Sequence, residues 1–332
     1  MNASPSFDRS PPLLLLVCAL ALATAPAARA RPSPHASPEP RHAVLGVDPR
    51  ENARVHAIFG ARAGAAIVYD VVRDRIVSVV HPPFAFSVVH PPGSLMKLVT
   101  AFALLEHGLV SDADVVDCTN HLTIRGNSYT CAVKGGHGRV NLHEAIVRSC
   151  CSFFYTIGQR LPPRLWLAAA RELGLGAPSP FPGGVRAQVH LPRSPRDRTL
   201  MLVGEGPAVR ITPWDALHLV VRLRRLARTN SAAAFVYAAM RDVVERGTGQ
   251  AARIRGVDVR GKTGTSAWLH SSEHPHPTHG WFAATARNLA VVVYVERGTG
   301  DDAALLAGRI LRALLDPPPP HAPRTPHGGE KD

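Results

Sequence analysis

The chemistry of this chain is indicated first by its lysines, which are rare among its cations. Lysine occurs only at positions 97, 134, 262 and 331, whereas arginine is frequent along the whole length. Two of these lysines lie beside hydroxyl residues, in Ser94-Leu95-Met96-Lys97 and in Lys262-Thr263-Gly264-Thr265. A lysine amine can lose its proton when it is desolvated and act as a base, whereas a guanidinium stays protonated. This pattern suggests a serine acyl-transfer site.

Ser94 and Lys97 are three residues apart, which places them on one face of a helix and lets the lysine reach the hydroxyl. The preceding Pro91-Pro92-Gly93 predicts a turn that exposes Ser94 at the start of an apolar helix. The N-terminus of that helix also favours developing negative charge. A chain of this length can contain such a spacing by chance, so the interpretation depends on other motifs.

A second motif lies on an expected late strand and carries groups that can hold an anion. Lys262 offers positive charge, and the hydroxyls of Thr263 and Thr265 can hold a carboxylate. Gly264 lets a ligand backbone approach an exposed strand, because it has no side chain. The motif therefore suits recognition of a peptide that ends in a carboxylate.

A third motif, Ser149-Cys150-Cys151, lies immediately before an aromatic run at 153–155. Ser149 can relay a proton between Lys97 and a leaving amine. The motifs S-x-x-K, S-D-N and K-T-G together are typical of β-lactamases and penicillin-binding proteins. This chain has the three in that order, with a variant second motif.

The elements that position these motifs are expected at both ends of the chain and in its middle. We expect strands at 64–69, 75–80, 257–265, 280–286 and 289–296, and helices at 94–107, 142–161, 165–173, 213–228, 232–246 and 301–315. Strands at both ends with helices between them imply a sheet built from distant segments. The fold class is therefore α/β of the α+β type, an antiparallel sheet flanked by helices plus a helical subdomain.

The N-terminus predicts export. Arg9 precedes an apolar run at 13–23, and Ala28-Arg29-Ala30 has the A-x-A form of a cleavage site, so residues 1–30 are expected to be a cleaved signal peptide. The apolar run has about half of the roughly 20 residues needed to cross a bilayer. We expect a location in the periplasm or at the outer face of the cytoplasmic membrane, with membrane contact only through an uncleaved signal segment.

Composition and residue bias divide the rest of the chain. Residues 31–43 are rich in Pro, Ser and His and are expected to be a linker, 44–316 a folded domain, and 317–332 a disordered tail. Hydrophobic residues make up 45% of the chain, which is enough for a large core. The net charge is +13, but the arginines are scattered without a compact basic run, so we expect no nucleic-acid partner.

Four cysteines remain after the signal segment. In an oxidising compartment the best disulfide candidate is Cys118 with Cys131, a short loop whose closure would contribute about 3 kcal/mol; reduced thiols are the alternative. Cys150 and Cys151 are adjacent, and a bridge between them would be strained, so buried free thiols are expected.

Several histidines of the chain are considered as metal ligands. His270, His274, His276 and His279 cluster between two expected strands, but their Pro-rich spacing matches no standard zinc site. His137 lies between two glycines, and the sequence allows two roles for it: a residue of a structural turn or a residue that lines the cleft. We expect no metal and no cofactor.

Taken together, the motifs resemble the transpeptidase domain of penicillin-binding proteins, especially class B, over residues of about 60 to 312. Further segments also fit this family: 136–142, Gly204-Glu205-Gly206 followed by Ile211-Thr212-Pro213, Gly247-Thr248-Gly249, and Gly280-Trp281-Phe282. The resemblance implies the β-lactamase/transpeptidase-like fold, with the site between the sheet and the helical subdomain.

The resemblance also implies a reaction. Ser94 would attack the carbonyl between the two terminal D-Ala residues of a peptidoglycan stem peptide, and an amine of a second stem would resolve the acyl-enzyme into a cross-link. Lys97 would be the base and Ser149 the relay. Backbone N–H groups of Ser94 and Thr265 would form the oxyanion hole. The substrate carboxylate would lie against Lys262, Thr263, Gly264 and Thr265. β-Lactams would acylate the same serine.

Two positions depart from the family pattern. The family has Asn at the third position of its second motif, where this chain has the substrate-facing Cys151, a weaker donor and acceptor. Glu205 takes the place of the usual Gln. The alternatives left open are a catalytically weakened β-lactam-binding or regulatory protein, a class D-like β-lactamase and a D,D-carboxypeptidase. Expected partners are stem peptides, β-lactams and a separate glycosyltransferase or cell-wall synthesis complex.

Overall fold

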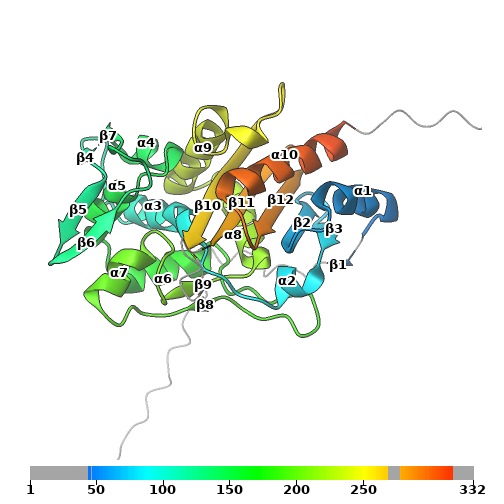
Figure 1. Ribbon diagram of the computed structural model, residues 1–332, viewed down its shortest axis with the longest axis horizontal. Coiled ribbons are helices and arrows are strands. Elements are labelled where there is room, and N and C mark those ends of the chain that lie inside the picture. Colours follow the sequence, from blue (N-terminus) through cyan, green and yellow to red (C-terminus); the bar gives the residue numbers. More distant parts are fainter. Residues whose placement is uncertain (1–43, 46, 268–276, 317–332) are drawn as a thin grey trace, which may run out of the picture. The chain divides into compact units, whose positions relative to one another are not determined.

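A computed structural model describes residues 44–45, 47–267 and 277–316 (Figure 1). The predicted signal peptide, linker and tail lie outside the described residues, as do His270, His274 and His276. None of the helices in the described part is both long and apolar enough to cross a bilayer.

The centre of the molecule is a six-stranded sheet whose strands come from the two ends of the chain. Its spatial order is β1-β3-β2-β12-β11-β10, and every neighbouring pair is antiparallel except β1 with β3. The strands are β1 (Val44–Leu45), β2 (Gly64–Asp70), β3 (Arg75–Val80), β10 (Val259–Ala267), β11 (Thr278–Ala286) and β12 (Leu289–Val295). The predicted assembly of a sheet from distant segments is confirmed.

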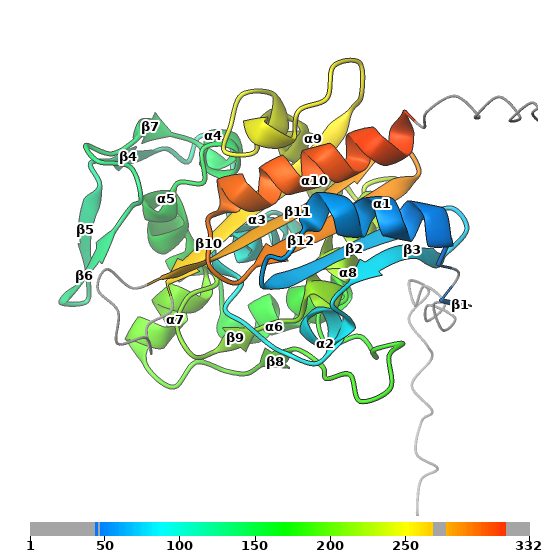
Figure 2. The same cartoon turned by 45° about the vertical axis from the view of Figure 1, so that its right-hand side comes forward.

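Both faces of the sheet are covered, and its strands β2 and β12 are buried along their whole length. Side chains alternate between the faces, and in β11 Trp281 contributes to one hydrophobic core while its neighbour Phe282 contributes to the other. Helices α1 (Pro49–Phe59) and α10 (Gly300–Leu315) lie side by side over the Phe282 face (Figure 2). Fully buried strands of this kind read as continuous apolar runs in the sequence.

The opposite face carries the larger core and the helical part of the molecule. Its helices are α2 (Pro82–Phe86), α3 (Met96–Glu106), α4 (Leu142–Val147), α5 (Cys151–Ile157), α6 (Pro163–Glu172), α7 (Pro195–Met201), α8 (Pro213–Leu226) and α9 (Ser231–Glu245). Small two-stranded sheets pair β4 (Val116–Cys118) with β7 (Gly138–Val140), β5 (His121–Ile124) with β6 (Asn127–Thr130), and β8 (Gln188–Val189) with β9 (Val209–Arg210). Short 3-10 helices lie at Gly93–Leu95, Gly158–Arg160 and Gln250–Ala252. Helices α1, α2 and α7 and these short strands were not predicted from the sequence.

Two predicted helices differ from the observed ones where the site is formed. The helix expected at 142–161 is interrupted between α4 and α5, because Ser149 adopts a left-handed backbone with φ of 57°. The helix expected at 94–107 begins with the 3-10 turn Gly93–Leu95, so Ser94 precedes the α-helical part. Left-handed backbone is costly for a residue with a side chain and is held by surrounding structure, commonly at functional sites.

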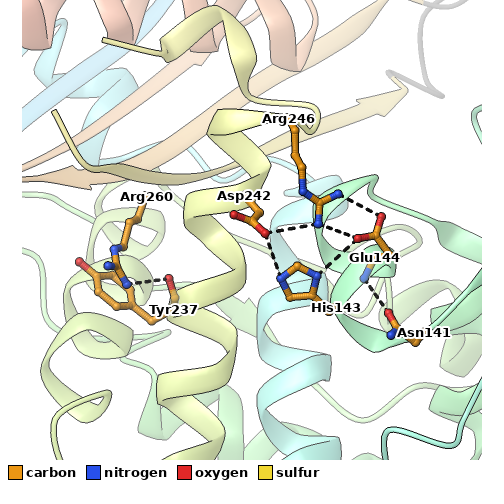
Figure 3. Close-up of polar contacts among 7 residues, drawn as sticks. All are labelled: Asn141, His143, Glu144, Tyr237, Asp242, Arg246 and Arg260. Carbon is orange, nitrogen blue, oxygen red and sulfur yellow. Dashed lines mark hydrogen bonds and ion pairs between the residues drawn. The ribbon is translucent and has the colours of Figure 1, made fainter. Parts of the chain in front are cut away.

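A cluster of charged side chains joins α4 to α9 beside that interruption (Figure 3). Arg246 Nη2 lies 2.6 Å from Glu144 Oε1 and 3.3 Å from Asp242 Oδ2, and His143 Nε2 lies 3.3 Å from the same Asp242 oxygen. Asn141 accepts a hydrogen bond from the Glu144 N–H and caps α4. The two ion pairs of Arg246 are partly exposed, and each contributes about 0 to 1 kcal/mol. Helix α9 also packs on β10, so these contacts connect α4 through α9 to the edge of the sheet.

Candidate active site

Ser94 lies in a turn that packs backbone against backbone on β10. Gly93 has φ of 54°, and a Cβ added to it would lie 2.4 Å from the carbonyl oxygen of Thr265. A Cβ on Gly264 would lie 2.5 Å from the oxygen of Pro92. Both glycines are therefore required by close approach. The turn leaves the side chain of Ser94 half-buried at the wall of a cavity.

The Gly204-Glu205-Gly206 segment supports the same turn from the other side. The Gly93 N–H donates to the carbonyl oxygen of Gly204 over 3.1 Å. Gly204 has φ of 77°, and a Cβ there would lie 2.1 Å from the carbonyl oxygen of Gly93. This contact brings Glu205 to the cavity that Ser94 lines.

Lys97 is fully buried in α3, and its side-chain nitrogen is held by the interrupted helix. Nζ donates to the Ser149 carbonyl oxygen over 2.6 Å, to Ser149 Oγ over 3.2 Å and to Cys151 Sγ over 3.1 Å. The sequence predicts that Lys97 reaches the Ser94 hydroxyl, but the hydrogen bonds of Lys97 in this structure go to Ser149 and Cys151. Catalytic hydrogen bonds often tighten only when substrate binds.

Lys262 approaches the same serine from β10. It is fully buried, and Nζ donates to Ser149 Oγ over 2.9 Å and to the Thr263 carbonyl oxygen over 3.1 Å. Burial, with a smaller contribution from the charge of Lys97, lowers the pKa of Lys262 well below its ordinary value. The Ser149 oxygen thus accepts from two lysines, which directs its own proton elsewhere.

Thr263 and Thr265 point to the other face of β10 from Lys262, since neighbouring residues of a strand alternate. Thr263 Oγ1 hydrogen-bonds Thr248 Oγ1 over 2.6 Å, and Thr265 Oγ1 accepts from the Gly300 N–H over 2.9 Å. Both threonines line the cavity. Their role in holding a carboxylate stays a prediction. Within the described sheet β10 is an edge strand, so a peptide can approach it.

The cavity has a volume of about 430 Å³. Five residues that line the cavity were predicted from the sequence as site residues: Ser94, Ser149, Cys151, Thr263 and Thr265. Other lining residues had no predicted role in the site; they include Arg148, Tyr155, Glu205, Thr248, Thr299, Gly300 and Asp301. Glu205 and Thr248 lie in glycine-flanked motifs that the resemblance had already marked. The residues at the start of α10 carry no comparable signal.

Glu205 has the most strongly perturbed carboxyl group of the cavity. Burial raises its pKa from the ordinary value of 4.5 to about 7, although the charges of Lys97 and Arg210 act in the opposite direction. Because the folded-state pKa is raised, the ionised form is disfavoured by folding. This cost is present at pH values above about 7 and disappears as the pH falls below 4.5.

We therefore expect Glu205→Gln to stabilise the protein at pH 8 by about 2 kcal/mol, a value reduced for partial solvent exposure. At pH 4.5 the variant and the parent should have nearly equal free energies of unfolding. Urea unfolding at the two pH values measures this. A pH-independent difference between the two proteins would contradict the assigned titration.

The cysteines differ from their prediction. Cys118 and Cys131 are buried free thiols rather than the predicted disulfide, and both sulfurs contact His137 Nδ1, at 3.5 and 3.3 Å. Both sulfurs therefore contact the buried imidazole of His137 instead of bonding to each other. Cys150 is a buried free thiol, as expected, whereas Cys151 is only half-buried and lines the cavity.

Comparison with known proteins agrees with this geometry. The family model for the penicillin-binding protein transpeptidase domain matches residues 64–316. The chain belongs to this family. Its sequence is 27% identical to the peptidoglycan D,D-transpeptidase MrdA of Acinetobacter baumannii over 146 residues, and 27% identical to the peptidoglycan D,D-transpeptidase PbpA of Mycobacterium tuberculosis over 276 residues.

These alignments cover 41% and 70% of this chain, but only 22% and 55% of those relatives. A crystal structure of Pseudomonas aeruginosa PBP2, in complex with WCK 5153, has a TM-score of 0.74 and 20% sequence identity. That match covers 82% of this chain and 79% of the other. The predicted β-lactamase/transpeptidase-like fold is confirmed.

Proposed function

We propose that this chain is a penicillin-binding serine D,D-transpeptidase that acts on peptidoglycan stem peptides. The observation that carries the proposal is the hydrogen-bonded series Lys97–Ser149–Lys262 beside the cavity that Ser94 lines. Three motifs separated by more than 50 residues in the sequence thus meet at one serine hydroxyl. The names of the two curated relatives support the same reaction.

In the first step, Ser94 Oγ loses its proton to a neutral Lys97 and attacks the carbonyl carbon between the terminal D-Ala residues. The C–N bond breaks, and the leaving amine takes a proton from Ser149, which Lys262 or Lys97 can replace. The oxyanion would accept hydrogen bonds from the N–H groups of Ser94 and Thr265. The close approach of Gly93 to Thr265 supports this pairing.

In the second step, an amine of a neighbouring stem attacks the ester carbonyl, a new amide forms, and Ser94 Oγ recovers its proton. The carboxylate of the donor peptide would lie at the exposed edge of β10, near Thr263 and Thr265. We further propose that the protein is exported and works in the periplasm or at the outer face of the cytoplasmic membrane. A separate glycosyltransferase or synthesis complex would supply the glycan strands.

The experiment is an exchange assay with a peptide that ends in D-Ala-D-Ala and a D-amino acid acceptor, read by mass spectrometry. Release of D-Ala with acceptor incorporated supports the transpeptidase. Release without incorporation points to a D,D-carboxypeptidase, and turnover of a β-lactam points to a β-lactamase. Stable penicillin binding with no reaction on the peptide points to a binding or regulatory protein.

The observation that favours the last alternative is Cys151. It occupies the position where the family has Asn, and its sulfur accepts from Lys97 at 3.1 Å. The hydrogen bond with Cys131 and burial raise the pKa of Cys151 well above its ordinary value, so it is a neutral thiol. A thiol orients a substrate amide less well than a carboxamide does.

We expect Cys151→Asn to accelerate acylation by a fluorescent penicillin about fivefold, since one added hydrogen bond contributes about 1 kcal/mol. The measurement is the second-order rate constant of labelling. Cys151→Ala is the matched control and should show no acceleration. Equal rates for Asn and Ala at this position would show that the carboxamide has no role.

A further inference from the structure

Next to the cavity lies a cluster of four buried side chains that the proposed reaction does not use. The sulfurs of Cys118, Cys131 and Cys150 and a ring nitrogen of His137 lie within 4.8 Å of one another. Cys118 ends β4, Cys131 follows β6, His137 precedes β7, and Cys150 immediately precedes α5. Four separate segments therefore bring soft donors to one point.

The distances suit one tetrahedral ion. With Zn–S of about 2.3 Å and Zn–N of about 2.0 to 2.1 Å, the sulfur and nitrogen ligands of one zinc ion lie about 3.6 Å apart. His137 Nδ1 lies 3.5 Å from Cys118 Sγ and 3.3 Å from Cys131 Sγ. All four donor atoms lie within 4.8 Å of one another, so a small inward shift of these atoms would complete the site.

The surrounding hydrogen bonds orient the donors. His137 Nε2 lies 3.1 Å from the Arg148 carbonyl oxygen, and only a protonated Nε2 can donate to it. This tautomer leaves the Nδ1 lone pair directed at the sulfurs. A backbone carbonyl on the far nitrogen is the usual outer partner of a metal-bound histidine. The Cys151 N–H donates to Cys131 Sγ over 3.2 Å, a contact that suits a thiolate.

We propose that Cys118, Cys131, His137 and Cys150 bind one Zn²⁺ ion in a closed Cys₃His site. Four protein ligands leave no open position, so the ion is structural. Binding converts three thiols to thiolates and releases their protons, so that the site carries a net charge of −1. From the sequence alone we expected no metal, and we predicted a disulfide between two of these cysteines, Cys118 and Cys131.

The site would hold the segment that carries the relay serine, and this consequence rests on the proposed function. Cys150 directly follows Ser149, whose left-handed φ of 57° places its Oγ between Lys97 and Lys262. His137 reaches the same segment through Arg148, whose Nη1 donates to the His137 carbonyl oxygen over 3.0 Å. A metal ligand beside Ser149 would offset the cost of its backbone conformation.

The test is the metal content of the purified full chain after expression in medium that contains zinc, measured by inductively coupled plasma mass spectrometry. We expect one zinc per chain. Replacement by Co²⁺ should give the intense visible bands of a tetrahedral ion and the near-ultraviolet charge-transfer bands of thiolate ligands. This spectrum is recorded on the unaltered chain, so it does not depend on whether a variant folds.

Variants locate the ligands. Cys118→Ser and Cys150→Ser should bind zinc at least tenfold more weakly, whereas the matched control Cys151→Ser, a neighbouring cysteine outside the cluster, should keep one zinc per chain. Equal loss of zinc in Cys150→Ser and Cys151→Ser would overturn the ligand assignment. A chain free of metal, two mass units lighter from a Cys118–Cys131 disulfide, would overturn the proposal.

The metal measurements are independent of the reaction. A chain that binds zinc but neither reacts with the peptide nor labels with penicillin would support this site while the proposed function fails. Removal of zinc by a chelator should lower the melting temperature, and an unchanged melting temperature would contradict a structural ion.

Discussion

Replacement of Ser94 by alanine is expected to abolish covalent labelling of the protein by a fluorescent penicillin. Ser94 is half-buried at the cavity wall, and its turn is held by backbone contacts that a change of side chain leaves intact. The fold should therefore survive while the nucleophile is lost. Labelling is followed by gel fluorescence, and the mass of the intact protein reports the acyl adduct.

Ser128→Ala is the control, since Ser128 is exposed on β6 and outside the cavity. It should label at the parent rate. Labelling of a folded Ser94→Ala variant at a comparable rate would mean that another residue is the nucleophile. That residue would then have to be identified from the site of the acyl adduct.

Replacement of Lys97 by arginine is expected to slow acylation by a factor of about 10² to 10⁴, although the charge is kept. General base catalysis contributes a factor of this size, and a guanidinium cannot accept the proton of Ser94. Lys97 is also fully buried between Ser149 and Cys151, where a guanidinium does not fit without displacing them. The second-order rate constant of penicillin labelling measures the loss.

Lys134→Arg is the matched control, because Lys134 is exposed. Its rate of acylation should equal that of the parent. Unfolding curves separate a catalytic loss from a folding defect in Lys97→Arg. A rate within about threefold of the parent for a folded Lys97→Arg would remove Lys97 from the role of base.

The sequence predicted the turn at Ser94 and the strand β10 well, because their signals are local. Pro91-Pro92-Gly93 specifies a turn, and a short run of residues that favour strands, bounded by turn residues, specifies a strand, wherever the rest of the chain lies. Likewise, an apolar run such as that of α3 must be buried. The predicted boundaries of α6, α8 and α9 therefore agree with the structure to within two residues.

The interruption at Ser149 was not predictable in the same way. Residues 142–161 have a continuous helical pattern, and no glycine or proline marks position 149. Ser149 takes a left-handed backbone in a setting where Lys97, from α3, and Lys262, from β10, both hydrogen-bond it. Such contacts come from tertiary packing, which local propensity does not record.

The cysteines show a similar limit. Spacing made a disulfide between Cys118 and Cys131 the best prediction, because a short loop closes easily. The position of His137 beside both sulfurs depends on how β4 and β7 pair, and the position of Cys150 depends on the break before α5. These facts become visible only when the strands and helices are assembled.

The sequence by itself determined the family and the fold class, and it predicted the residues that would carry the chemistry, because these depend on residue types and their order. Tertiary structure decided which hydroxyl the two lysines share, that Glu205 enters the cavity, and that three cysteines meet a histidine. The physical reason is that burial and hydrogen bonding act between segments far apart in the chain. Their geometry is set by the packing of the whole domain.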